Sequence, residues 1–303
     1  MVIDSPLFKA KYPFKSHFLD LNGLAYHYLD EGSGEPVIMV HGNPTWSFYY
    51  RNLARQLSKY YRVIVPDHIG CGLSMKPADS LYSYQLKQRV DDLERLIEHL
   101  NLPDKVTLVL HDWGGMIGMA WANRHPQRVG RIVLFNTAAF RLPATKKLPL
   151  ALKVCRDTRF GAFLVQGFNL FARVAARVGC QRNPMPAEIR ELYCSPYDNW
   201  QHRIATLRFV QDIPLQPGDA SYELVTEVEQ GLAQFRQTPA CICWGEKDFV
   251  FDDHFLRQWQ EHLPQAEIHR FADCGHYILE DATEEIIPIV RDFLRNHPLS
   301  SSL

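Results

Sequence analysis

The chain has 303 residues, enough for one large α/β domain or for a core with an inserted subdomain. Charged residues make up 22% and hydrophobic residues 46%, which is typical of a soluble globular protein. The formal net charge of −1 argues against nucleic-acid binding as the main task, because that task calls for a concentrated basic surface.

Short apolar runs alternate along the chain with helical patterns. Strands are predicted at 36–40, 62–66, 106–110, 131–135, 240–244 and 266–271. Helices are predicted at 83–100, from 112 to about 124, near 221–235, and at 252–262 and 284–296. Near-continuous apolar runs suit a sheet that is covered on both faces. The repeated alternation predicts a mostly parallel sheet with right-handed crossovers.

One long stretch, residues 138–215, breaks this alternation. It contains helical segments, basic residues and scattered prolines, but no clear buried strand. An insertion of this length between two strands predicts a helical cap over the carboxyl ends of the sheet. The expected organisation is a core in two parts, 1–137 and 216–303, with the cap between them.

Cysteine usage and hydropathy both predict a soluble cytoplasmic protein. The seven cysteines show no CxxC or Cys/His spacing, so we expect reduced thiols and no metal site. The first 14 residues are polar and contain two prolines, which is not the pattern of a signal peptide. The longest uncharged apolar stretch, 161–172, is shorter than the roughly 20 residues that span a bilayer, although a peripheral membrane contact stays open.

Three ionisable residues, Asp112, Asp248 and His276, follow three successive predicted strands in chain order. The order nucleophile, acid, histidine is typical of the α/β-hydrolase fold, which implies a mostly parallel eight-stranded sheet. Their side chains would meet at the carboxyl edge of that sheet. Asp112 alone could be only a helix N-cap, but its two companions favour a nucleophile.

The rival acids near Asp248 are Asp252, Asp253 and Asp273. The loop after the preceding strand reads Asn136-Thr137 and carries no charge, so Asp248 is the preferred acid.

Two neutral hydrogen-bond donors are expected beside Asp112. Asn43 lies in HGNPTW (41–46), after the first predicted strand, and Trp113 follows Asp112 directly. Either could be an ordinary turn or core residue, but two donors aimed at one point suit a departing anion. A carboxylate is a weak nucleophile that needs no base, so it suits an alkyl carbon bearing a good leaving group. The start of the following helix favours its ionised form.

At HGNPTW, HDWGG, GEKD and DCGH the chain resembles the haloalkane dehalogenases over nearly its whole length. The resemblance implies an alkyl ester on Asp112, an anion held by Asn43 and Trp113, and a His276–Asp248 pair that activates water. Epoxide hydrolases share the Asp elbow but usually rely on two cap tyrosines, for which Tyr193 and Tyr197 are the candidates.

Longer stretches at 65–77, 136–143 and 196–215 are similar to one branch of this group, the β-lactone decarboxylases of long-chain olefin biosynthesis. That resemblance implies a cis-3,4-dialkyl-β-lactone substrate, a cis-alkene product, and association with a β-lactone synthetase. A true haloalkane dehalogenase is the second hypothesis, and a non-catalytic ligand-binding protein on this fold is the third. No cofactor is implied, because EGSGEP (31–36) lacks the spacing of a dinucleotide-binding loop.

The cap should supply an apolar site for long chains. The candidate substrate-binding residues are Trp46, Phe163, Phe168, Trp200 and Phe209, although each could equally pack the cap on the core. Basic residues nearby, Arg173, Arg177 and Arg182, form either a solvated face or a surface for a partner enzyme or anionic lipid.

Overall fold

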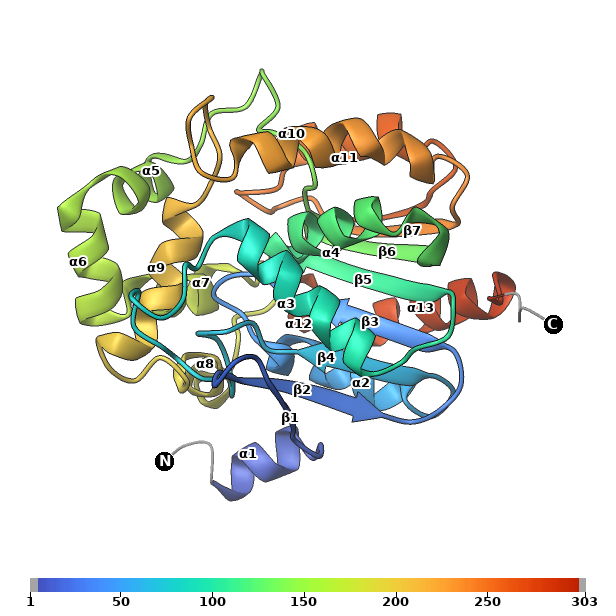
Figure 1. The fold of residues 1–303 in the computed structure, drawn as a ribbon, viewed down its shortest axis with the longest axis horizontal. Coiled ribbons are helices and arrows are strands. Elements are labelled where there is room, and N and C mark those ends of the chain that lie inside the picture. Colours follow the sequence, from blue (N-terminus) through green and yellow to red (C-terminus); the bar gives the residue numbers. More distant parts are fainter. Residues whose placement is uncertain (1–4, 300–303) are drawn as a thin grey trace.

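A computed structural model describes residues 5–299 as an eight-stranded sheet covered by helices on both faces (Figure 1). The strand order is β1-β2-β4-β3-β5-β6-β7-β8. The strands are β1 (His17–Asp20), β2 (Ala25–Glu31), β3 (Pro36–Val40), β4 (Arg62–Pro66), β5 (Val106–Asp112), β6 (Val129–Thr137), β7 (Ala240–Gly245) and β8 (Glu267–Phe271). Only the β1–β2 and β2–β4 pairings are antiparallel. The predicted α/β-hydrolase fold with its mostly parallel sheet is confirmed.

Most of the predicted strands are buried in the sheet. Every residue of β3 and β5 is buried, because these strands lie in the middle of the sheet with helices on both sides. The sequence pattern did not predict β1 and β2, which form the antiparallel side of the sheet. In β1 half-buried and exposed positions alternate, so the strand carries no apolar run.

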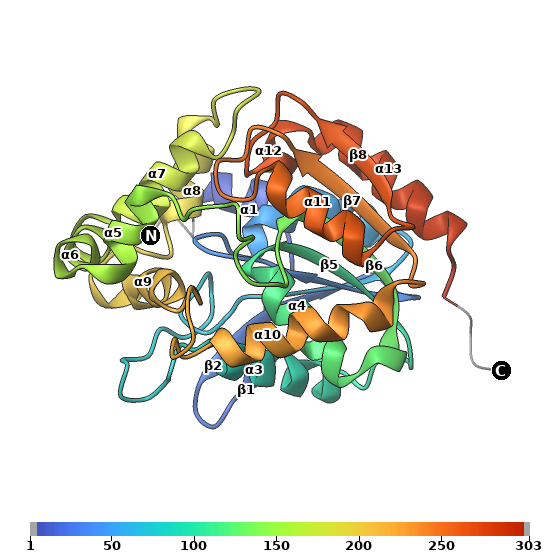
Figure 2. The same ribbon diagram turned by 90° about the horizontal axis from the view of Figure 1, so that it is seen from above.

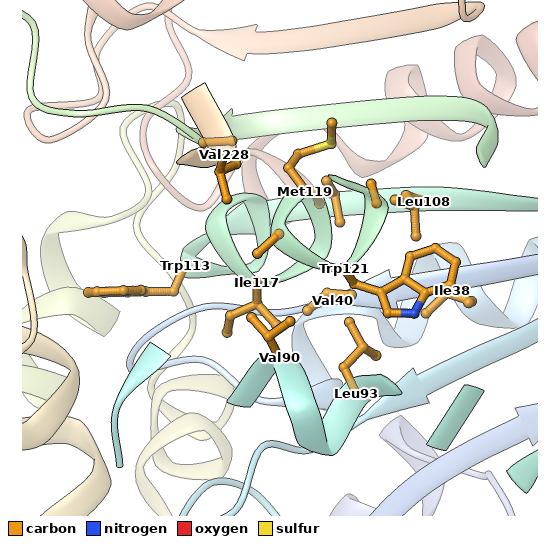
Figure 3. Packing of buried hydrophobic residues seen from close by; sticks show 14 of the residues in the cluster. Ile38, Val40, Val90, Leu93, Leu108, Trp113, Ile117, Met119, Trp121 and Val228 are labelled. Atoms are coloured by element: carbon orange, nitrogen blue, oxygen red, sulfur yellow. The ribbon is translucent and has the colours of Figure 1, made fainter. Parts of the chain in front are cut away.

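Helices cover both faces of the sheet (Figure 2). The core helices are α1 (Pro6–Lys11), α2 (Arg51–Leu57), α3 (Leu86–His99), α4 (Trp113–Arg124), α10 (Tyr222–Gly231), α11 (Asp253–His262), α12 (Ile278–Asp281) and α13 (Thr283–Asn296). In Figure 3, Ile117 and Trp121 of α4 pack beside Val90 and Leu93 of α3. This apolar layer fixes α4, and therefore the residue that precedes it, against the sheet.

The segment predicted as a cap contains only helices and loops. It holds α5 (Leu150–Asp157), α6 (Arg159–Phe168), α7 (Leu170–Val178), α8 (Ala187–Cys194) and α9 (Ile204–Gln211). These helices gather at one end of the sheet, on the side where β5 ends and α4 begins (Figures 1 and 2). The cysteines are unpaired, as predicted, and no helix in residues 5–299 is long and apolar enough to cross a membrane.

Gly114, in the first turn of α4, is a point at which the fold allows no side chain. A Cβ there would lie 1.9 Å from the Val40 carbonyl oxygen. We expect Gly114→Ala to lower the free energy of unfolding by about 3 kcal/mol or more, because backbone must move to admit the methyl group. Gly167→Ala is the matched control: in α6 the nearest atoms would lie 3.6 Å away. Urea unfolding of both variants tests this, and an equal loss in the two would contradict it.

Candidate active site

Asp112 occupies a sharp turn between β5 and α4. Its backbone has φ 52° and ψ −125°, in the positive-φ region that non-glycine residues rarely adopt. Three glycines make this turn possible, because a Cβ on Gly42, Gly114 or Gly115 would fall within 2.0 Å of a neighbouring atom. Such strain is typical of a nucleophile that the fold pushes out of the sheet.

The carboxylate of Asp112 is buried but well supported. Its Oδ1 accepts a hydrogen bond of 2.5 Å from the backbone N–H of Asn43. Burial raises the pKa of Asp112, whereas His276 and the backbone N–H groups of Asn43 and Trp113 act in the opposite direction. These three groups stabilise the ionised form, which is the form that can attack carbon.

Asp248 and His276 form a buried pair beside this carboxylate. Asp248 Oδ2 lies 2.7 Å from His276 Nδ1, and Asp248 Oδ1 accepts hydrogen bonds from the N–H groups of Val250 and Phe251. The other ring nitrogen, His276 Nε2, lies 3.6 Å from Asp112 Oδ2. Burial lowers the pKa of His276, but Asp248 and Asp112 outweigh it and the net shift is upward. The protonated ring is therefore favoured between two carboxylates.

The rival acids are engaged elsewhere. Asp252 caps α11 and binds Lys146, Asp253 pairs with Arg270, and Asp273 pairs with Arg182. Asn136 holds β6 to β7, because its amide exchanges two hydrogen bonds with the backbone of Gly245.

Asn43 and Trp113 face the same space as Asp112. Asn43 Nδ2 donates to the carbonyl oxygen of Thr206 in α9 at 3.1 Å, which leaves its second hydrogen available. The Trp113 indole packs against Phe209, with ring centroids 5.4 Å apart, and points away from the core in Figure 3. Its N–H forms no hydrogen bond with residues 5–299. Two neutral donors are thus free near one carboxylate.

These groups lie at the floor of a cavity whose lining is mostly apolar. Its polar side chains are Asn43, Asp112, His276, Lys146 and Trp113. The apolar walls come from the loop after β6, from α5, α7 and α9, and from residues 249–251. A cavity so apolar suits a substrate with hydrocarbon chains.

All five aromatic residues predicted for substrate binding lie outside this cavity. Trp46 is fully buried in a stack with Phe8 and Phe48, and Phe209 supports Trp113 from behind. Phe163, Phe168 and Trp200 are about half exposed on the outside of the cap. Tyr193 and Tyr197 donate to Glu280 and to the Thr45 carbonyl and do not line the cavity.

Most of the apolar residues that do line it were missed. They include Leu148, Leu152, Val210 and Phe251. A helical periodicity places residues on a common face, but it does not tell which face of a cap helix turns inwards. The sequence offered one signal for a residue in the cavity wall: Phe251 follows Asp248 closely in the chain and should therefore lie near the site.

The comparisons with known proteins agree with the observed fold. A family model described as the alpha/beta hydrolase fold matches residues 35–283. The cis-3-alkyl-4-alkyloxetan-2-one decarboxylase of Shewanella oneidensis is 58% identical over 282 residues, covering 93% of this chain and 89% of that protein. The enzyme of the same name from Xanthomonas campestris is 48% identical over 296 residues, covering 95% and 98%. Among solved structures, the haloalkane dehalogenase DatA from Agrobacterium tumefaciens has a TM-score of 0.83 at 27% identity, covering 94% and 97%.

Burial of the ionised Asp112 carboxylate should lower the free energy of unfolding. Because burial raises the pKa of Asp112 in the folded chain, its ionisation disfavours folding at neutral pH. We expect Asp112→Asn to raise the urea midpoint at pH 7. This gain should shrink as the pH falls towards about 3.9, where the carboxyl is protonated in the unfolded chain as well. Asp79→Asn, at a surface pair with Arg208, is the control and should change little. A gain that does not depend on pH would contradict this explanation.

Proposed function

We propose that this chain, which belongs to the α/β-hydrolase fold family, is a decarboxylase of cis-3-alkyl-4-alkyloxetan-2-ones that uses Asp112 as its nucleophile. The observation that carries the proposal is a carboxylate, rather than a hydroxyl, beside two free neutral donors in an apolar cavity. The 58% and 48% identities to enzymes named for this reaction support the substrate class.

The first step is displacement at the ring carbon that bears oxygen. Asp112 Oδ2, the oxygen not bound to the Asn43 N–H, attacks this carbon and inverts it. The ring C–O bond breaks and its electron pair leaves with the lactone oxygen as a carboxylate. Asn43 Nδ2 and the Trp113 indole N–H stabilise that anion, as two donors would stabilise a halide. Relief of ring strain drives the step.

The second step is elimination. The new carboxylate loses carbon dioxide, and the electrons of the broken C–C bond form the double bond. The alkyl C–O bond to Asp112 breaks at the same time, so the residue regains its carboxylate and both of its oxygens. Inversion followed by anti elimination is syn overall, and a cis lactone therefore gives a cis alkene. No water is consumed.

His276 has a task that differs from that in a hydrolase. Two neighbouring carboxylates raise its pKa, which favours the cationic imidazole, and no step of the proposed reaction needs it as a base. As a cation 3.6 Å from Asp112, it stabilises the negative charge that moves from Asp112 to the departing carboxylate and back.

The cavity also determines what reaches the nucleophile. Its apolar walls on α5, α7 and α9 would hold the two alkyl chains and exclude water from the ester. Such a lactone must be supplied by an enzyme that closes a β-hydroxy acid, so we place the chain after a β-lactone synthetase in olefin biosynthesis, in the cytoplasm.

A haloalkane dehalogenase is the second candidate function. The Asp248–His276 pair could activate water if His276 were neutral, and the fold matches dehalogenases closely. The two reactions share the attack by Asp112. They differ in how the Asp112 ester is cleaved, by elimination in the decarboxylase and by water in the dehalogenase.

A side-by-side assay separates the two enzymes. Purified protein is given a cis-dialkyl-β-lactone, followed for alkene, and a long 1-haloalkane, followed for halide. We expect fast formation of cis-alkene, little halide, and a loss of at least about a thousandfold in Asp112→Asn, since the nucleophile is gone. A trans alkene would contradict inversion with anti elimination, and fast halide release without alkene would make the protein a dehalogenase.

His276→Gln tests how the ester is resolved. In the proposed reaction no base is needed, so alkene should still form, slower by about a hundredfold or less, and no alkylated Asp112 should accumulate. Mass spectrometry of the enzyme during turnover of the lactone makes the measurement. A stoichiometric ester on Asp112 would instead indicate a hydrolytic step that depends on His276.

Trp113→Phe removes one donor and keeps the ring. We expect kcat for the lactone to fall by about a hundredfold, because the departing carboxylate loses one hydrogen bond. Trp200→Phe is the matched control, since Trp200 is half exposed and outside the cavity. Equal kcat values for the two variants would show that the Trp113 N–H does not hold the anion.

A further inference from the structure

The outer side of the cap exposes an unusual amount of apolar surface. Thirteen large hydrophobic side chains are exposed among residues 5–299, and eight of them belong to α5, α6, α7 and the loop before residue 201. We call these eight the outer cap face: Leu150, Phe160, Phe163, Phe168, Leu170, Val174, Val178 and Trp200. Singly exposed apolar residues are ordinary, but their concentration on neighbouring helices marks a surface that contacts something else.

The helices that carry this face are packed together. α6 contacts both α5 and α7, and Phe163 lies against Phe168 and Trp200, with ring centroids 5.6 and 6.1 Å apart. Figures 1 and 2 show α5 and α6 at the end of the molecule opposite to the C-terminus. Each of these side chains is at least 36% exposed, so a partner outside the chain can reach them.

Basic residues accompany the apolar ones. On α7, Leu170, Val174 and Val178 recur every four residues, and the exposed Arg173 and Arg177 lie directly beside them. An apolar row flanked by long cationic side chains is typical of a helix that lies in a membrane interface, where the guanidinium groups extend to the phosphates.

The charge of the cap is opposite to that of the rest of the chain. Residues 138–215 contain twelve Lys and Arg against five Asp and Glu, which gives +7, whereas the whole chain carries −1, so the remainder carries −8. Several other cations of the cap are neutralised, for example Arg141 by Glu229 and Arg208 by Asp79. Arg159, Arg173 and Arg177 form no ion pair with residues 5–299.

The outer cap face also borders the cavity that holds Asp112. Leu170 and Val174 line this cavity and are 37% and 44% exposed, and Val178 on the same helix is exposed outside the cavity lining. A long-chain molecule lying against α7 would therefore be close to the cavity.

We propose that the outer cap face docks on the surface of an anionic lipid bilayer, with its apolar residues among the acyl chains and Arg159, Arg173 and Arg177 at the phosphates. A lipid surface fits better than a protein partner because the cap is strongly cationic, and its unpaired Arg159, Arg173 and Arg177 lie on α6 and α7, the helices that carry most of the exposed apolar side chains. The inference goes beyond the reaction and holds for any apolar substrate of the cavity.

Vesicle flotation of the full chain tests this. Vesicles of phosphatidylcholine and phosphatidylglycerol in equal parts should carry the protein upwards, and vesicles of phosphatidylcholine alone should carry much less. Added salt should weaken the binding, because it screens the lipid charge. The triple variant Arg159→Gln, Arg173→Gln, Arg177→Gln should lower the partition coefficient by at least about tenfold.

The matched control replaces three exposed arginines that lie outside the cap, Arg55→Gln, Arg257→Gln and Arg295→Gln. It should bind anionic vesicles like the wild type, while both triples keep the wild-type melting temperature. Equal losses of vesicle binding in the two triple variants would show that only the net charge of the protein matters, and would overturn the proposal. Wild-type protein that floats with neither kind of vesicle would also overturn it.

A second variant tests the apolar part. Leu150→Ser, Phe160→Ser and Val178→Ser together remove exposed side chains that do not line the cavity. Binding to anionic vesicles should fall severalfold even at low salt. If the wild type is instead a dimer by sedimentation velocity and this variant a monomer, the outer cap face is an interface between two copies and the lipid proposal is wrong.

Discussion

The whole site depends on keeping one carboxylate ionised where water is scarce. Asp112 is 7% exposed at the floor of an apolar cavity, and burial raises its pKa and so disfavours the ionised form. The fold opposes this with the Asn43 and Trp113 backbone N–H groups and with His276, which Asp248 holds in place. Each of these groups lies on a loop or helix start that follows a strand, so the sheet positions the groups that stabilise the charge of Asp112. The strained turn at Asp112 persists because this surrounding structure determines it.

The sequence predicts where this constellation lies because Asp112 and Asp248 follow strands with clear apolar runs, and His276 follows the amphipathic last strand. Once Asp112, Asp248 and His276 stand after parallel strands, topology alone brings them to one edge. The antiparallel strands β1 and β2 escaped prediction because β1 has no buried position and β2 mixes His27 and acidic residues with its apolar ones. The cavity walls escaped it for another reason: Phe163 and Phe171 belong to neighbouring helices of similar composition, and only packing decides that Phe171 turns inwards while Phe163 is exposed.

The cap therefore has two faces with different physical tasks. Its inner face, with Leu152, Phe171 and Val210, makes the apolar walls that a water-free elimination requires. Its outer face combines exposed apolar side chains with unpaired arginines, and Leu170 and Val174 join the two. Both faces suit a substrate that is poorly soluble in water, so one small helical insertion would serve substrate delivery as well as protection of the ester.

The central claim is that Asp112 forms an alkyl ester that is released by elimination rather than by water. The most direct test is many turnovers of the lactone in ¹⁸O-labelled water, followed by mass spectrometry of the peptide that contains Asp112. Elimination breaks the alkyl C–O bond, so Asp112 should keep its original oxygens while alkene accumulates. Incorporation of ¹⁸O into Asp112 would mean that water attacks the ester, and the enzyme would then be a hydrolase.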